Sequence, residues 1–232
     1  MTVVLVLFTL IAFLTADRFV QRYREKRALQ PAIRAAGIPV LSSIPLPDGT
    51  AVALNHTWYR IGPNGVCTVG LDEFVGRLAG AVESIFLPGS GLAVSQDRPG
   101  ITLRDGNRKL EFSTPVSGHV MKVNHSVLRH PGLLNRDPYG DGWLLKIRAE
   151  QGNDNASSGK QGRDAVEWLK DQVDRAKQFL VERSSQPELA LMMDGGALAD
   201  GVLKSFDGDV WQDFQRTFVA STQKPEQKDV RP

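Results

Sequence analysis

Between residues 48 and 149, the apolar positions fall into short segments separated by glycine, proline and other turn residues. Short segments at this spacing predict an all-β unit of the sandwich or barrel type. Helical turns are expected at 72–78, where Asp72 is a candidate cap, and near 126–134. The expected strands are 51–54, 57–61, 66–69, 85–87, 101–103, 109–112, 119–123 and 143–148.

After residue 162 the period of the apolar positions changes to that of a helix. A helix is predicted over 163–184, where Asp164 and Glu167 fit a capping box. Its apolar face would contain Val166, Leu169, Val173, Ala176 and Leu180. A weaker helical pattern covers 188–206, and a third helix is predicted over 209–221. Trp211, Phe214 and Phe218 share one face of that third helix.

The N-terminus contains an uncharged apolar run at residues 2–16. The run is short for a spanning helix, which needs about 20 apolar residues. No basic residue precedes it, and Leu14-Thr-Ala16 is a poor cleavage site, so an uncleaved membrane anchor is favoured over a secretory signal or a buried soluble helix. Five basic residues follow the run, and this bias places the rest of the chain in the cytoplasm as a single-pass protein of the inner membrane. They are Arg18, Arg22, Arg24, Lys26 and Arg27.

These patterns divide the chain into six parts. Residues 1–36 form the anchor and a basic stalk, and 37–47 a proline-containing linker. The β domain spans 48–149, followed by a polar flexible linker at 150–162. The helical extension at 163–221 can either pack on its neighbours or bind an unknown partner protein. Residues 222–232 are a disordered tail.

Composition removes several classes of function. The net charge of +2 among 232 residues gives no ground for nucleic-acid binding. The single cysteine, Cys67, excludes an intramolecular disulfide and a cysteine metal cluster, and its place in an expected strand indicates a small core residue.

No catalytic or metal site is predicted. The histidines lie outside any HExxH pattern, with His119 expected on a strand and His56, His125 and His130 on loops. Asp207, Asp209 and Asp213 resemble the start of a calcium loop but lack its central glycine and closing glutamate, so helix capping explains Asp207 or Asp209 more simply. The glycines at 89 and 91 precede no helix and indicate a turn.

The centre of the β unit is a predicted hairpin over residues 101–112. Asp105-Gly106 is a type I′ turn signal, and β-forming residues flank it on both sides. Pro115-Val-Ser-Gly118 then ends the hairpin.

Several segments together resemble the H-protein of the glycine cleavage system, a lipoyl carrier of the biotinyl/lipoyl-domain superfamily. They are His56-Thr-Trp58-Tyr-Arg60, Thr68-Val-Gly-Leu71, Leu78 to Gly80, Ile85 to Gly91, Pro115-Val-Ser-Gly118, Val123-Asn124 and Leu134-Asn-x-Asp-Pro-Tyr-Gly-x-Gly-Trp143. The resemblance implies a mainly β fold, the flattened H-protein-like β-barrel (barrel-sandwich hybrid). An N-terminal transmembrane helix and a C-terminal helical extension would flank it.

The resemblance also implies where a lipoyl group would be attached. The family motif reads Glu-Ser-Val-Lys-Ala, with the lysine eight residues before the proline of Pro-Val-Ser-Gly. In this chain Asn107 takes the lysine position and Arg104 the glutamate position. Lys109 is the nearest amine, two residues further along. No cofactor is therefore expected, and lipoate on Lys109 is the alternative.

Three functions stay open from the sequence. The favoured one is a non-enzymatic, membrane-anchored H-protein-like module that binds or scaffolds proteins without a lipoyl group. The second is a working lipoyl carrier, for aminomethyl groups or electrons, modified at Lys109. The third is a structural subunit of a membrane complex.

Overall fold

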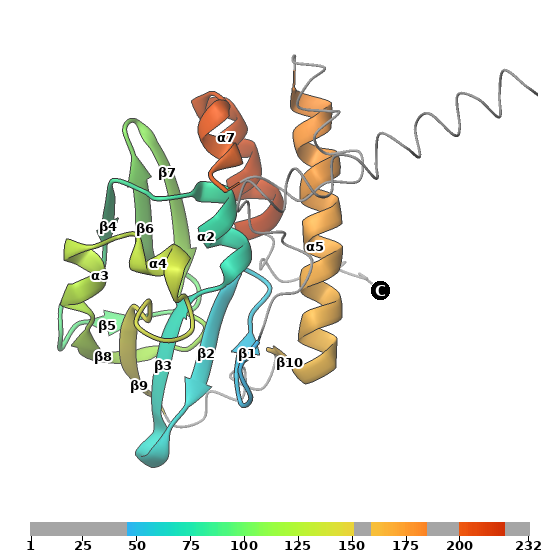
Figure 1. The fold of residues 1–232 in the computed structure, drawn as a ribbon. Coiled ribbons are helices and arrows are strands. Elements are labelled where there is room, and N and C mark those ends of the chain that lie inside the picture. The colour runs from blue at the N-terminus through green and yellow to red at the C-terminus, as the bar shows by residue number, and fades with distance from the viewer. Residues whose placement is uncertain (1–45, 151–158, 185–199, 221–232) are drawn as a thin grey trace, which may run out of the picture.

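The computed structural model describes residues 46–150, 159–184 and 200–220. Two antiparallel sheets form the centre of the molecule (Figure 1). The larger has the order β10-β1-β2-β3-β9-β8-β5 and the smaller the order β4-β6-β7. The strands of the larger sheet are β1 (Ala51–Val52), β2 (Thr57–Ile61), β3 (Val66–Leu71), β5 (Ala93–Val94), β8 (Gly118–Val123), β9 (Leu145–Ala149) and β10 (Lys160–Gln161). Those of the smaller are β4 (Ser84–Phe86), β6 (Pro99–Asp105) and β7 (Arg108–Ser113). The prediction of a mainly β unit is confirmed.

Helices lie at the ends and on one side of the sheets. Short helices α2 (Glu73–Ala79), α3 (His125–Arg129) and α4 (Leu133–Arg136) connect strands, and α5 (Gly162–Arg183) is the long one. The C-terminal segment contains the 3-10 helix η3 (Val202–Ser205), the α-helix α7 (Gly208–Phe214) and the short π-helix η4 (Gln215–Val219). The short 3-10 helix η1 (Pro63–Gly65) joins β2 to β3.

The core lies between the two sheets, where alternate residues of each strand point inward. These side chains are fully buried because the period-two alternation places them all on the facing sides of the sheets. They include Val69, Leu71, Ile101, Leu103, Leu110, Phe112, Leu145 and Ile147.

Four phenylalanines join the C-terminal helices to the β unit. Phe214 and Phe218 stack with ring centroids 4.8 Å apart, and both contact Phe74 of α2 and Phe179 of α5. Trp211 is also fully buried. The predicted apolar face of the third helix is therefore confirmed, and it packs against the chain's own barrel.

Helix starts and short strands differ from the sequence predictions. Asp72 caps α2 as predicted, by accepting a hydrogen bond from the amide of Val75. The prediction of a capping box at Asp164 and Glu167 is wrong, because α5 begins earlier, after Gln161, and no side chain caps it. Lys160 and Gln161, placed in the predicted linker, form β10 and pair with β1. The sequence also gave no sign of the two-residue strand β5.

The predicted anchor at 2–16, the stalk and the tail lie outside the described residues. Within the described ranges, no helix combines the length and apolar character needed to cross a membrane.

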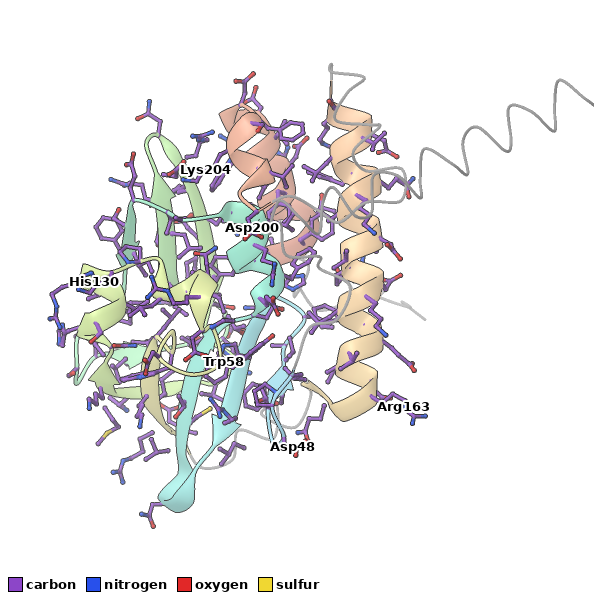
Figure 2. The ribbon with its side chains drawn as sticks, in the orientation of Figure 1. Asp48, Trp58, His130, Arg163, Asp200 and Lys204 are labelled. Atoms are coloured by element: carbon purple, nitrogen blue, oxygen red, sulfur yellow. The ribbon has the colours of Figure 1, made fainter. Side chains whose placement is uncertain are left out.

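Trp58 provides a direct test of this packing. It is fully buried, it donates a hydrogen bond from its indole nitrogen to the carbonyl oxygen of Pro138, and its position is labelled in Figure 2. A Cβ at Gly70 would lie 2.6 Å from the Trp58 ring. Gly70→Ala is expected to lower the free energy of unfolding by about 1–3 kcal/mol, because the ring has to move.

Gly132→Ala is the control, since nothing lies within 4 Å of a Cβ there. Its unfolding free energy should stay within about 0.5 kcal/mol of the wild type in urea titrations. Equal stability of the two variants would contradict the described packing of Trp58 against β3.

Candidate functional site at the hairpin apex

The hairpin of β6 and β7 ends in a two-residue turn. Asp105 pairs with Arg108, so Gly106 and Asn107 occupy the turn. Gly106 has a φ of 59°, and Asn107 is not among the residues with positive φ. A glycine at the first central position with this φ fits a type II′ turn. The predicted hairpin is confirmed, but the turn lies one residue later than predicted and is not of type I′.

The apex residue is an exposed amide, Asn107. Residue Arg104 lies on the outward face of β6, 5.2 Å from the Phe86 ring, and pairs across the strands with Lys109. The ammonium of Lys109 is 3.1 Å from the Glu111 carboxylate, and the side chain is 57% exposed. Lys109 therefore lies on strand β7, in the second residue pair from the turn, and not at the apex of the hairpin.

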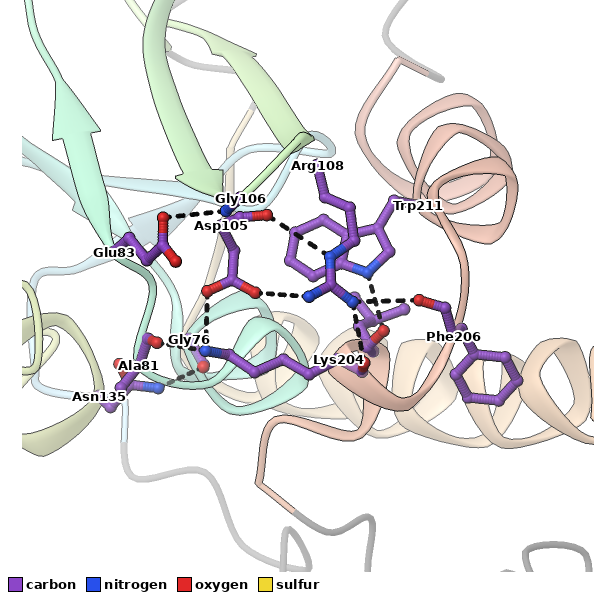
Figure 3. Close-up of polar contacts among 11 residues, drawn as sticks. Gly76, Ala81, Glu83, Asp105, Gly106, Arg108, Asn135, Lys204, Phe206 and Trp211 are labelled. Carbon is purple, nitrogen blue, oxygen red and sulfur yellow. Dashed lines mark hydrogen bonds and ion pairs between the residues drawn. The ribbon is translucent and has the colours of Figure 1, made fainter.

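The other face of the hairpin holds a buried carboxylate. Asp105 is only 5% exposed and lies 2.9 Å from both the Lys204 ammonium and the Arg108 guanidinium (Figure 3). The same guanidinium donates to the backbone carbonyls of Lys204, at 2.8 Å, and Phe206, at 3.2 Å. It also lies 5.3 Å from the Trp211 ring. We call these contacts between Asp105, Arg108, Lys204 and Phe206 the hairpin clasp.

Further hydrogen bonds hold the C-terminal segment against the barrel. Lys204 donates from its ammonium to the carbonyl oxygen of Ala81. The Gln215 side-chain amide both accepts from the Glu111 amide at 2.8 Å and donates to the Glu111 carbonyl at 2.6 Å. Because β7 is the edge of its sheet, this amide satisfies backbone groups that a further strand would otherwise use.

A second buried polar group lies beneath α5. The Nδ1 of His56 is 2.8 Å from the Asp72 carboxylate, and both side chains are fully buried. The imidazole stacks between Phe74, at 4.2 Å, and Trp168, at 4.8 Å, and its Nε2 has no hydrogen-bond partner among the residues that the structure describes. The carboxylate also caps α2, so Asp72 fixes both the helix and the ring. Among the described residues, no serine, threonine or cysteine side chain forms a hydrogen bond with either member of this pair.

The other predicted candidates are spread over the molecule. His119 lies on β8 as predicted, whereas His125 begins α3 and His130 follows it, so the prediction of a loop is wrong for His125. Within the described ranges, no group of three or more His, Cys, Asp or Glu side chains has the arrangement of a metal site.

The aspartates near the third helix have structural contacts. The N-cap residue of α7 is Asp207, without a capping hydrogen bond from its side chain. Hydrogen bonds from Arg216 and Arg183 hold the pKa of Asp213 below its usual value. Cys67 is buried as predicted, and burial raises the pKa of its thiol to about 12, so a reactive thiolate is disfavoured at neutral pH.

Comparison with known proteins assigns the β domain to a family. The family model described as glycine cleavage H-protein matches residues 51–172, more than half of the chain. The chain belongs to the glycine cleavage H-protein family. The sequence resemblance is thus confirmed, and with it the H-protein-like fold.

Individual relatives cover the same region. The glycine cleavage system H protein of Alteromonas mediterranea is 37% identical over 105 residues, which is 45% of this chain and 81% of the relative. The probable glycine cleavage system H protein 2 of Sulfolobus acidocaldarius is 33% identical over 126 residues, 53% of this chain and 82% of the relative. A crystal structure of the Mycobacterium marinum H protein is 25% identical, covers 45% of this chain and 86% of its own, and superposes with a TM-score of 0.42.

The hairpin clasp joins the family domain to residues beyond it. Asp105 and Arg108 lie inside the matched range, whereas Lys204 and Phe206 lie after its end at residue 172. Sequence reasoning missed the clasp, because its partners are separated by 96 to 99 residues and no local pattern relates them.

Two adjacent cations on β7 allow a matched test of the clasp. Arg108→Ala should lower the free energy of unfolding by about 2 kcal/mol, because it removes charge-assisted hydrogen bonds and leaves Asp105 with one cation. Hydrogen exchange of the Val202–Val219 amides should become faster. Lys109→Ala removes only an exposed pair and should change stability by less than about 0.5 kcal/mol. Equal effects of the two substitutions would show that the clasp does not hold the C-terminal segment.

Proposed function

We propose that this chain is an H-protein-like module without a lipoyl arm, which binds other proteins instead of carrying a group between them. The observation that carries the proposal is the hairpin apex, where Gly106 and Asn107 occupy the turn. A lipoyl arm is joined to an amine, and the carboxamide of Asn107 has no nucleophilic nitrogen with which to form that bond.

The surroundings of the apex support the same proposal. The hairpin clasp packs the C-terminal segment against one face of the hairpin, and Gln215 occupies the free edge of β7. A carrier has to present the apex of its hairpin to several enzymes in turn. Here one approach to that apex is occupied by the chain itself.

Lys109 is a poor replacement for the missing lysine. It lies two residues along the strand from the lysine position, which displaces the side chain by about 7 Å from the apex. It already pairs with Glu111, and Arg104 stands across the hairpin from it where the family motif has a glutamate. A lipoyl carrier modified at Lys109 is therefore the weaker candidate.

The C-terminal helices are also a poor choice for the main partner surface. Their large apolar side chains Trp211, Phe214 and Phe218 are buried in the chain's own core. The apolar seam of α5 within residues 163–180 is buried there as well, so a structural subunit held by that seam would first have to release it. Partner binding is better supported on the barrel itself.

A lipoylation assay tests the proposal. Full-length protein is incubated with a lipoate–protein ligase, lipoate and ATP, with an authentic H protein as the positive control. The wild type should gain no lipoyl mass, whereas R104E/N107K, which restores the lysine and its glutamate, should gain one adduct. Modification of the wild type that is abolished by Lys109→Arg would contradict the proposal and establish the carrier alternative.

We also propose that residues 2–16 attach the chain to a membrane, which their uncharged apolar sequence and the basic residues after them support. The full chain should sediment with membranes after an alkaline carbonate wash, and deletion of residues 2–16 should move it to the supernatant. Recovery of the full chain in the supernatant would contradict the attachment.

A further inference from the structure

The outward side of the larger sheet carries a cluster of basic residues. Its four central strands, β2, β3, β9 and β8, point only neutral or basic side chains outward. We call this surface the basic sheet face and define it by Arg60, His119, Lys122, Lys146 and Arg148. The net charge of the chain is only +2, because acidic residues elsewhere balance these basic ones, so the net charge alone does not indicate the cluster.

Two of these cations are direct neighbours. Lys122 and Lys146 are Cα partners across β8 and β9. Both ammonium groups approach the Trp143 indole, at 5.9 Å for Lys122 and 5.3 Å for Lys146. Like charges in directly opposite positions destabilise a sheet. The single indole only partly offsets that repulsion.

No carboxylate within the described part of the chain neutralises the pair. None of the ion pairs there involves Lys122, Lys146 or Arg148. The nearest acidic residues in sequence, Asp141 and Glu150, lie at opposite ends of β9 and are exposed. The sheet therefore keeps a like-charge contact that a single acidic substitution would relieve.

We propose that the basic sheet face is the docking surface for an acidic protein partner. This deepens the proposed function, on which it rests, by naming a surface and the chemistry of its partner. Carboxylates of the partner would lie between the paired lysines and beside Arg148, and so replace repulsion by attraction. Charge complementarity of this kind sets the rate and specificity of association.

The surface favours a protein over the other polyanions. A single-stranded nucleic acid needs open aromatic faces for base stacking, and here both lysines occupy the surroundings of the Trp143 ring. A lipid-binding face needs continuous apolar residues that insert. Ile61 is the Cα partner of the buried Cys67 and so lies on the opposite face of β2 from Arg60, which leaves Met121 of β8 as the one large exposed apolar side chain that the described part of this face can offer.

The test compares two double charge reversals in the full-length chain. K122E/K146E changes the basic sheet face and keeps a like-charge pair across the strands, so its fold should be preserved. R163E/K170E makes the same change in net charge on exposed positions of α5. Arg163 projects from the end of that helix, on the side of the molecule away from β8 and β9 (Figures 1 and 2). The probe is a fluorescent oligoglutamate peptide, with oligothymidylate and phosphatidylglycerol vesicles measured at the same ionic strength.

The wild type should bind oligoglutamate more tightly than either other probe. K122E/K146E should weaken this binding by about tenfold or more, and R163E/K170E by less than about twofold. Equal loss in the two variants would overturn the proposal in favour of net charge alone. Tighter binding of oligothymidylate or vesicles would overturn it in favour of those partners, and absence of oligoglutamate binding would overturn it outright. None of these outcomes depends on the lipoylation assay, so the two proposals fail separately.

A single substitution gives an independent readout. Lys146→Glu creates an opposite-charge pair with Lys122 and should raise Tm by roughly 1–3 °C while weakening oligoglutamate binding. A fall in Tm would show that Lys146 is required for the fold, and would overturn its assignment to binding.

Discussion

The Asp105 carboxylate is the group on which the arrangement of the hairpin depends. It is almost fully buried and is held by two cations, one from the next strand and one from the C-terminal segment. A buried charge is tolerated only with close partners, and removing one partner leaves a charge that is costly to keep from water. Asp105 therefore ties the order of the hairpin to the position of Lys204, about a hundred residues away.

This coupling supports the proposed difference between this chain and a lipoyl carrier. In the H-protein family the hairpin presents a modified lysine, but in this chain Asn107 is the second residue of the turn. The face of the hairpin that carries Asp105 and Arg108 forms hydrogen bonds with Lys204, which lies outside the residues matched by the family model. Gln215 also occupies the free edge of β7. Under the proposed function, the family fold is kept and a fixed binding surface replaces the lipoyl arm.

The parts that could be predicted from the sequence are those determined locally. Period-two alternation located the main strands. The eight-residue spacing to Pro115 placed Asn107 at the lysine position of the family motif, whereas the turn itself was predicted one residue too early. Local sequence patterns did not predict the elements and contacts that depend on a partner far away in the sequence. The two-residue strand β10 exists because β1 pairs with it, and the hairpin clasp joins segments separated by 96 to 99 residues. The paired lysines of β8 and β9 became neighbours only through strand register, which no local pattern specifies.

We propose that the hairpin carries no acyl arm in the cell. Intact mass spectrometry of the protein purified from its native source, without added ligase, measures the presence of such an arm directly. We expect a mass that contains no lipoyl group. A mass increased by one lipoyl group, located by peptide mapping to Lys109, would contradict it.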